Sequence, residues 1–175
     1  SDGGAAVVIT RKDRAKDGPH KPVTLLGYGE GHAYEHISQA KDLTTSAVVQ
    51  SGRAAYAEAG LTPDDIDLLQ LYDCFTPALL IQIEDLGFCG KGEGGVWLAS
   101  GITRPGGSKP MNTHGGMLSY CHPGNPGAMF GLTEAITQMR GDAGERQLQN
   151  LRTALCHAQG GIMSSHATII LGAED

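Results

Sequence analysis

The sequence lacks a long apolar run and an excess of positive charge. Its longest apolar stretches, such as residues 77–81, are far shorter than the roughly 20 residues that cross a bilayer. Lys and Arg number 13 against 19 Asp and Glu, so the formal net charge is -6. Nucleic-acid binding needs clustered positive charge, and we therefore expect neither a nucleic-acid nor a membrane partner. The opening residues carry no export signal, which favours a cytoplasmic location.

Cysteine is scarce and irregularly spaced. The chain has 4 cysteines, none of them in a CxxC pair: Cys74, Cys89, Cys121 and Cys156. The cytosol keeps such thiols reduced. The HAYEH segment from His32 to His36 lacks a third ligand for a metal. We expect no structural disulfide, no metal site and no bound cofactor.

Glycine, in contrast, is abundant. The 26 glycines are about twice the average usage, and several of them interrupt apolar segments as pairs, at Gly115-Gly116 and Gly160-Gly161. At such pairs the backbone turns sharply or approaches another group closely. The length fits one domain, residues 1–175, whose site is built from loops.

The order of apolar segments predicts an α/β fold. Short β-branched and apolar runs predict strands over residues 5–10, 22–28, 66–72, 151–156 and 167–171, and the loop-rich middle suggests a further short strand over 96–99. Capping residues, helical periodicity and terminal glycines predict helices over 44–60, 77–86 and 127–140. We expect a mixed five-stranded sheet covered by helices.

Reactive side chains gather in three segments, at residues 72–75, 115–124 and 156–161. Each segment follows a predicted strand or precedes a predicted helix. The fold can therefore bring all three to the carboxyl ends of the strands, where α/β proteins bind ligands. No segment is diagnostic alone.

Together the three segments resemble a known family. GGMLSYCHPG is similar to the thiolase loop in which a glycine pair precedes Gly-His-Pro, and the opening SDGGAAVV resembles the start of the thiolase C-terminal half. YDCF resembles the HDCF loop of sterol-carrier-protein-type thiolases, and CHAQGG falls where that type has a His-Asn loop. Over nearly its whole length the chain resembles the C-terminal half of the thiolase superfamily.

Departures from that pattern concern the reaction. No part of the sequence resembles the N-terminal thiolase half with its nucleophilic cysteine, so we expect the isolated chain to be inactive. Tyr72 stands where sterol-carrier-type thiolases have histidine, and Tyr120 where many members have lysine or a small residue. The pair resembles the steroid side-chain-cleaving aldolases, which split a carbon-carbon bond in a β-hydroxy acyl-CoA without a covalent acyl-enzyme.

The resemblance implies a role for each candidate catalytic residue. Retro-aldol cleavage needs a base and donors to an oxyanion rather than a nucleophile. Tyr72 and Tyr120 are the candidate acid/base residues, provided that their pKa falls from roughly 10 toward neutrality. His122 is the expected donor to the thioester oxygen. Cys74 is either a second, proton-donating cysteine or a small buried hydrophobe.

Further residues are expected to bind the substrate, a coenzyme A thioester. His157 either binds the thioester oxygen or only orients its loop. Backbone groups of the glycine pairs assist the oxyanion: Gly115, Gly116, Gly160 and Gly161. The implied protein partners are an N-terminal thiolase half or a second copy of the chain, together with the small OB-fold protein that such aldolases use.

Three functions stay open on the sequence. The leading one is retro-aldol cleavage of a β-hydroxy acyl-CoA with a sterol-type side chain. The second is a sterol-carrier-type thiolase or acetyl-CoA acetyltransferase fragment, and the third a non-catalytic scaffold subunit. The residue at position 72 discriminates the first two, because thiolase chemistry prefers histidine or asparagine there.

Overall fold

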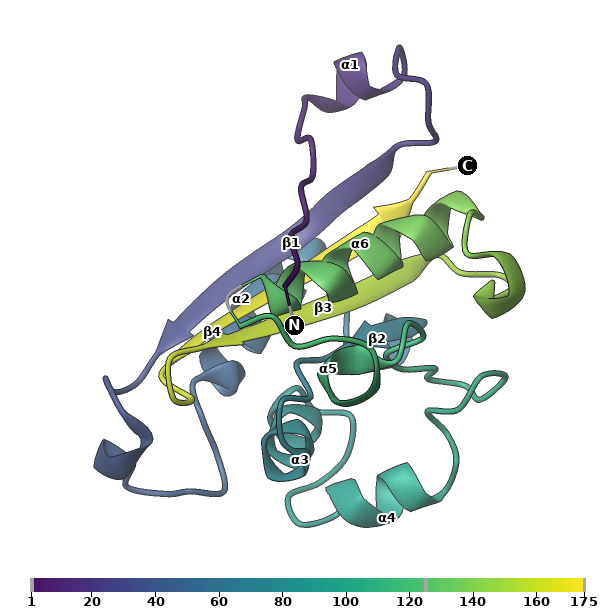
Figure 1. Cartoon of the computed structure of the whole chain (residues 1–175). Helices are drawn as coiled ribbons and strands as arrows, with labels where there is room; N and C mark the ends of the chain where they lie inside the picture. The colour runs from purple at the N-terminus through teal and green to yellow at the C-terminus, as the bar shows by residue number, and fades with distance from the viewer. Residues whose placement is uncertain (1, 125, 175) are drawn as a thin grey trace.

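A computed structural model describes residues 2–124 and 126–174; Ser1, which opens the SDGGAAVV segment, lies outside them. The centre of the fold is one four-stranded sheet with the order β1-β4-β3-β2 (Figure 1). The strands are β1 Val23–His32, β2 Leu68–Gln70, β3 Thr153–Gly160 and β4 Ser165–Ala173. β4 is antiparallel to both β1 and β3, whereas β2 is parallel to β3. The sheet is therefore mixed, as predicted.

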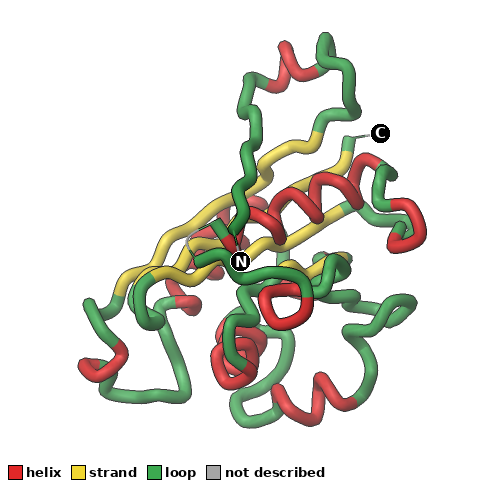
Figure 2. The backbone as a smooth tube through the Cα atoms, viewed as in Figure 1, coloured by secondary structure: helices red, strands yellow, loops and turns green. Residues whose placement is uncertain are grey.

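Helices cover both faces of this sheet. The described helices are α1 Lys12–Ala15, α2 Val48–Ala59, α3 Thr76–Asp85, α4 Gly94–Ala99, α5 Gly116–Ser119 and α6 Gly127–Arg140. Helix α6 crosses the front of the sheet in Figure 1, and α2 lies behind it. Long stretches of loop separate the elements between β2 and α6 (Figure 2). None of these helices combines the length and hydrophobicity that a membrane crossing requires.

Alternation along the strands divides the core in two. On the α2 side, Val48 and Ala55 pack with Leu69, Leu155 and Ile170. A second cluster lies under α6 and contains Leu68, Ala135, Met139, Ala154, Cys156 and Leu171. Successive strand residues point to opposite faces, so the even-numbered residues of β2 face α6. This parity places Tyr72 on the α6 side.

Three glycines of β1 let α2 approach the sheet closely. A Cβ atom at Gly27, Gly29 or Gly31 would lie 2.3, 2.2 or 2.1 Å from the carbonyl oxygens of Ala55, Ser51 and Ala47, respectively. These carbonyls recur every four residues, one turn apart along the helix. The backbone of α2 therefore rests directly on the strand, and any side chain would push it away.

We predict that Gly29→Ala destabilises the chain by about 1–3 kcal/mol or more, because overpacking forces backbone to move. Urea denaturation measures the free energy of unfolding. Gly95→Ala is the matched control: apart from its chain neighbours and the backbone of its own helix, no atom of the described residues lies within 4 Å of a Cβ built at Gly95. A Gly29→Ala variant as stable as the parent would contradict the close packing of α2 on β1.

Two strand predictions are wrong, and the sheet has four strands rather than five. Residues 5–10 lie outside any strand, with Val8 95% and Ile9 87% exposed. Their β-branched composition gives strand propensity, but a strand also needs the hydrogen bonds of a neighbour, which the described residues do not supply. The segment at 96–99 belongs to α4, in which Trp97 packs against Phe88 with ring centroids 6.1 Å apart. A short apolar run fits a strand and a helix equally well.

A single residue occupies the sheet position beyond β2. Met111 forms an isolated parallel bridge with Leu69. The Leu69 N–H donates to the Pro110 carbonyl (3.0 Å), and the Asn112 N–H donates to the Leu69 carbonyl (2.9 Å). The edge of β2 is thereby covered, although the covering segment is too short to count as a fifth strand.

Candidate active site

The structure brings two predicted site residues together. Tyr72 follows β2 on the α6 side, and His122 lies in the connection between α5 and α6. The Tyr72 hydroxyl lies 3.1 Å from His122 Nε2, and the two rings meet edge to face with centroids 5.7 Å apart. A phenol and an imidazole at this distance share a hydrogen bond through which a proton can pass.

Asp73 joins the two loops that carry this pair. Its buried carboxylate accepts a hydrogen bond from the Met117 N–H at 2.6 Å. A Cβ at Gly116 would lie 2.2 Å from Asp73 Oδ2, and Gly116 also has a φ of +66°. Gly115 has a φ of +109°. Both glycines are thus required by the turn into α5, and Gly116 also by the contact with the carboxylate.

Burial keeps the Tyr72 phenol protonated. Partial desolvation raises the pKa of Tyr72 above its ordinary value of 10.0, and repulsion from the ionised form of Cys74 raises it further to a smaller extent. The direction is opposite to the one that a free phenolate base requires. In this structure Tyr72 is a hydrogen-bond donor near neutral pH, and His122 Nε2 is the atom that faces its hydroxyl.

Cys74 lies beside the same strand end. Its Sγ is 3.8 Å from Nε2 of Gln159, which is near the end of β3. Burial is the largest cause that raises the pKa of the Cys74 thiol above 9.0. The side chain is therefore a neutral thiol, able to donate a proton but poorly suited to act as a resting nucleophile.

Tyr120 belongs to a different cluster. Its side chain is 62% exposed, and its ring stands edge-on to those of His114 (5.7 Å) and Phe130 (5.8 Å). These residues line a cleft of about 340 Å³ together with Thr133, Glu134, Thr137 and Arg146. Within the described residues, no hydrogen bond links Tyr120 to Tyr72 or His122.

His157 lies on the other face of the sheet. The prediction of a loop over residues 156–161 is wrong for residues 156–160. These residues belong to β3, whose last pair with β4 is Gly160 with Ser165. His157 is buried on the α2 side, with Nδ1 2.9 Å from Thr168 Oγ1 and Nε2 3.2 Å from His166 Nδ1. Gly161, with a φ of +59°, begins the turn to β4.

The histidine pair is electrostatically neutral. Burial, followed by the neighbouring His166, lowers the pKa of His157 from 6.5 to about 3. Burial also lowers the pKa of His166. Thr168 continues the chain of hydrogen bonds to Ser51 of α2 (2.9 Å). In this geometry His157 ties the sheet to α2.

We predict that acid weakens the fold through this pair. A histidine with a lowered folded pKa binds more protons when unfolded, so its stabilisation is complete above pH 6.5 and is lost as the pH falls toward about 3. Each such group contributes up to about 1.4 kcal/mol per pH unit in that window. Urea midpoints between pH 7 and pH 4.5 should fall less steeply for His157→Gln than for the parent. The exposed His20, changed to Gln, is the control, and equal slopes in all three would count against the proposed titration.

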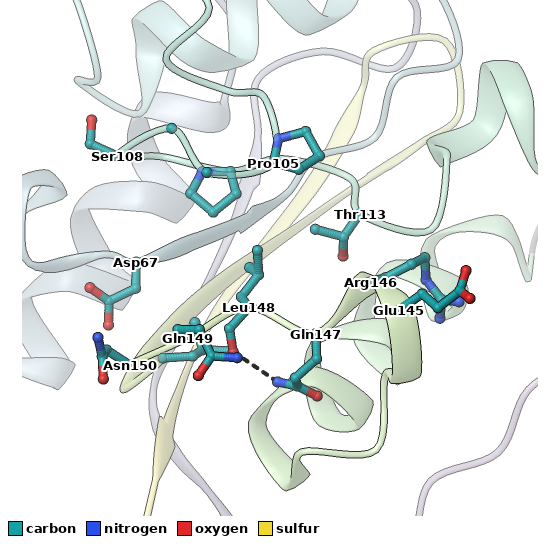
Figure 3. Close-up of a pocket in the computed structure, with 14 residues that line it drawn as sticks. Asp67, Pro105, Ser108, Thr113, Glu145, Arg146, Gln147, Leu148, Gln149 and Asn150 are labelled. Atoms are coloured by element: carbon teal, nitrogen blue, oxygen red, sulfur yellow. Dashed lines mark hydrogen bonds between the residues drawn. The ribbon is translucent and has the colours of Figure 1, made fainter.

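A larger cavity of about 630 Å³ lies at the opposite end of the parallel strands (Figure 3). Its lining includes Asp67, which precedes β2, and Leu151, which precedes β3. The Asp67 carboxylate already accepts the N–H groups of Arg152 (2.9 Å) and Thr153 (3.0 Å). None of the predicted site residues lines this cavity. Among the residues that the structure describes, no cluster of three or more His, Cys, Asp and Glu could hold a metal.

Sequence reasoning gave no role to Asp73 or His166. Asp73 stands inside the YDCF motif, and its position between two candidate residues was the available signal. His166 had no such signal, because only the register of β4 against β3 places it beside His157.

Comparison with known proteins identifies the class. A family model described as "Thiolase C-terminal domain-like" matches residues 29–173, and the chain belongs to this family. The resemblance predicted from its motifs is thereby confirmed.

Relatives in this family include both an acyltransferase and an aldolase. The chain is 36% identical to an acetyl-CoA acetyltransferase of Methanothermobacter thermautotrophicus, over 92% of the chain and 42% of the relative. It is 37% identical to a steroid side-chain-cleaving aldolase of Thermomonospora curvata, over 99% of the chain and 44% of the relative. A solved structure described as "Ltp2-ChsH2(DUF35) aldolase" superposes with a TM-score of 0.84 and 35% identity, over 93% of the chain and 42% of that structure. The chain thus spans less than half the length of these relatives.

Proposed function

We propose that this chain forms the C-terminal half of a thiolase-like enzyme that cleaves a β-hydroxy acyl-CoA by a retro-aldol reaction. The observation that carries the proposal is the hydrogen bond between Tyr72 and His122. A sterol-type side chain is the expected acyl group. The 37% identity to a steroid side-chain-cleaving aldolase supports this choice of reaction.

The pair can move the proton that the reaction requires. As the substrate hydroxyl loses its proton to the Tyr72 oxygen, the phenol proton passes to His122 Nε2. The bond between the α and β carbons then breaks, and its electron pair forms the thioester enolate while the β carbon becomes a carbonyl. The proton held by His122 returns through Tyr72 to the α carbon. No phenolate is needed at rest, which agrees with the raised pKa of Tyr72.

The enolate oxygen needs hydrogen-bond donors. The sequence pointed to His122 for this role, but His122 here receives the Tyr72 proton. We therefore assign the role to the glycine loop that Asp73 holds beside Tyr72, where the Gly115 N–H already donates to the Asn112 carbonyl (2.8 Å) and Gly116 is the candidate donor. Gly160, Gly161 and His157 stay candidates for substrate contacts, although His157 is buried in this chain. The substrate is a coenzyme A thioester, and no resident cofactor is proposed.

Partners complete the proposed enzyme. Residues 1–175 act as one C-terminal domain, joined by an N-terminal thiolase half or a second copy. The neighbour described as an Ltp2-ChsH2(DUF35) aldolase contains two named components, which supports a further partner protein. The motif resemblance implies that this partner is a small OB-fold protein. A cytoplasmic location agrees with this set of partners.

A thiolase of the sterol-carrier type is the second candidate. It is favoured by the 36% identity to an acetyl-CoA acetyltransferase and by the thiol of Cys74 at the strand end. In that enzyme Cys74 would donate the proton and a cysteine outside this chain would be the nucleophile. A non-catalytic scaffold is the third, and the retained Tyr72–His122 pair speaks against it.

We predict that Tyr72→Phe lowers cleavage of a β-hydroxy acyl-CoA by about 10²- to 10⁴-fold in the assembled enzyme, because the variant loses only the proton-transferring hydroxyl. Substrate binding should change little. Steady-state assays of ketone release measure the effect. Tyr120→Phe should retain more activity, since Tyr120 stands in the separate cleft beside His114.

Two further variants make this test selective. Tyr56→Phe removes a phenol hydroxyl that donates to the Leu86 carbonyl (3.2 Å), far from the pair, and should leave the rate unchanged. Cys74→Ala should matter little to an aldolase. An active Tyr72→Phe enzyme together with a dead Cys74→Ala enzyme would establish the thiolase reaction instead.

A further inference from the structure

The backbone beyond β2 is paired by side chains instead of strands. β2 ends at Gln70, but Leu71 and Tyr72 each still have a backbone N–H and a carbonyl that need hydrogen-bond partners. Asn112 Oδ1 accepts the Leu71 N–H (2.8 Å), and Asn112 Nδ2 donates to the Leu71 carbonyl (3.0 Å). Gln82 Oε1 accepts the Tyr72 N–H (3.1 Å), and Gln82 Nε2 donates to the Tyr72 carbonyl (2.8 Å). Two carboxamides thus replace the neighbouring strands that would otherwise hold this backbone.

Gln82 stands where helix packing alone would favour an apolar residue. It belongs to α3, is 1% exposed and has Ile83 and Leu79 as buried neighbours on the same helix. Burying a carboxamide is unfavourable unless its hydrogen bonds are made, and here both functional atoms bond to one residue, Tyr72. The amide therefore fixes the peptide groups on both sides of the Tyr72 Cα, and so the direction in which the phenol leaves the backbone.

We propose that Gln82 is a positioning residue that holds the Tyr72 phenol at hydrogen-bond distance from His122. The adjoining Asp73 connects to Met117 at 2.6 Å, so the loop of His122 is anchored to the same stretch of backbone. When the two hydrogen bonds from Gln82 are removed, the Tyr72 backbone is released while the His122 loop stays anchored through Asp73. The 3.1 Å contact between the Tyr72 hydroxyl and His122 Nε2 is then lost. The catalytic consequence rests on the function proposed above, whereas the geometric consequence does not.

The geometric test uses this chain labelled with 3-fluorotyrosine. The Tyr72 fluorine resonance is assigned by its disappearance in Tyr72→Phe. In the parent, His122→Ala should displace that resonance, because it removes the partner of the phenol. In the Gln82→Met background, the same His122→Ala change should displace it little or not at all.

Gln138→Met is the matched control. Gln138 is also 1% exposed and also clamps backbone, donating to the Arg146 carbonyl (2.8 Å) and accepting the Leu148 N–H (2.9 Å). Its Nε2 donates in addition to Glu134 Oε1 (3.0 Å). Its variant loses at least as many hydrogen bonds as Gln82→Met but should keep the full displacement by His122→Ala. A displacement in Gln82→Met equal to that in the parent would overturn the proposal. If Gln82→Met does not fold, Gln82→Leu carries the same test, since it also removes both hydrogen bonds to Tyr72 and places no charge in the core.

Kinetics of the assembled enzyme separate this proposal from the proposed function. Gln82→Met should lower kcat for β-hydroxy acyl-CoA cleavage by about 10- to 100-fold, the effect of a misplaced catalytic group, with KM little changed. Gln138→Met should leave kcat near that of the parent. If the fluorine displacement is lost in the Gln82→Met background while the parent enzyme shows no retro-aldol activity, the positioning role is upheld and the proposed reaction is rejected. If the displacement stays intact in the Gln82→Met background while the parent enzyme cleaves the substrate, the reaction is upheld and the positioning role is rejected.

Discussion

The candidate site depends on one buried carboxylate. Asp73 accepts the Met117 N–H at the start of α5, and Gly116 leaves room for its oxygens. Asn112 also joins the backbone after β2 to the segment before α5, through its two hydrogen bonds to Leu71, but Asp73 is the residue next to Tyr72 that holds the start of α5. With this contact, Tyr72 and His122 leave their loops on the same side of the sheet and meet at 3.1 Å. The geometry of the pair thus follows from a hydrogen bond between two loops far apart in the sequence.

Electrostatics gives the pair its direction of proton transfer. Burial raises the pKa of both Tyr72 and Cys74, so the strand end holds two neutral donors rather than two anions. A neutral phenol next to an imidazole can accept a proton only by passing its own to the ring. This coupling makes the Tyr72–His122 pair, and not either residue alone, the unit that would perform acid/base chemistry.

Local sequence signals predicted the three longest helices and the four strands of the sheet well, but not the short helices α1, α4 and α5. Helix 127–140 coincides with α6, and the segments at 44–60 and 77–86 enclose or nearly match α2 and α3. The predictions that failed for residues 5–10 and 156–160 concern segments whose structure depends on whether a neighbouring strand pairs with them. Residues 5–10 have strand composition but no neighbour among the described residues, and residues 156–160 lie in a strand because β4 pairs with them. Glycine-rich composition alone gave no sign of that pairing.

The candidate site, too, was predictable only where local sequence motifs identify its residues. Motif resemblance drew attention to Tyr72 and His122, and their contact agrees with it. The burial of His157 could not be read from its motif, because it depends on which face of β3 the residue occupies. The separation of Tyr120 from the pair could not be read from its motif either, because it depends on the packing of its ring against His114 and Phe130. The amide of Gln82 carries no local signal, since its role depends on the packing of α3 beside β2.

The central claim is that Tyr72 and His122 act as one unit in carbon-carbon bond cleavage. A double-mutant cycle with Tyr72→Phe, His122→Ala and the combined variant of the assembled enzyme tests it most directly, with the rate of β-hydroxy acyl-CoA cleavage as the readout. Residues that share one proton transfer give non-additive losses, so the combined variant should be about as slow as the slower single variant. If the two losses multiply instead, the residues act independently and the proton relay between them does not operate.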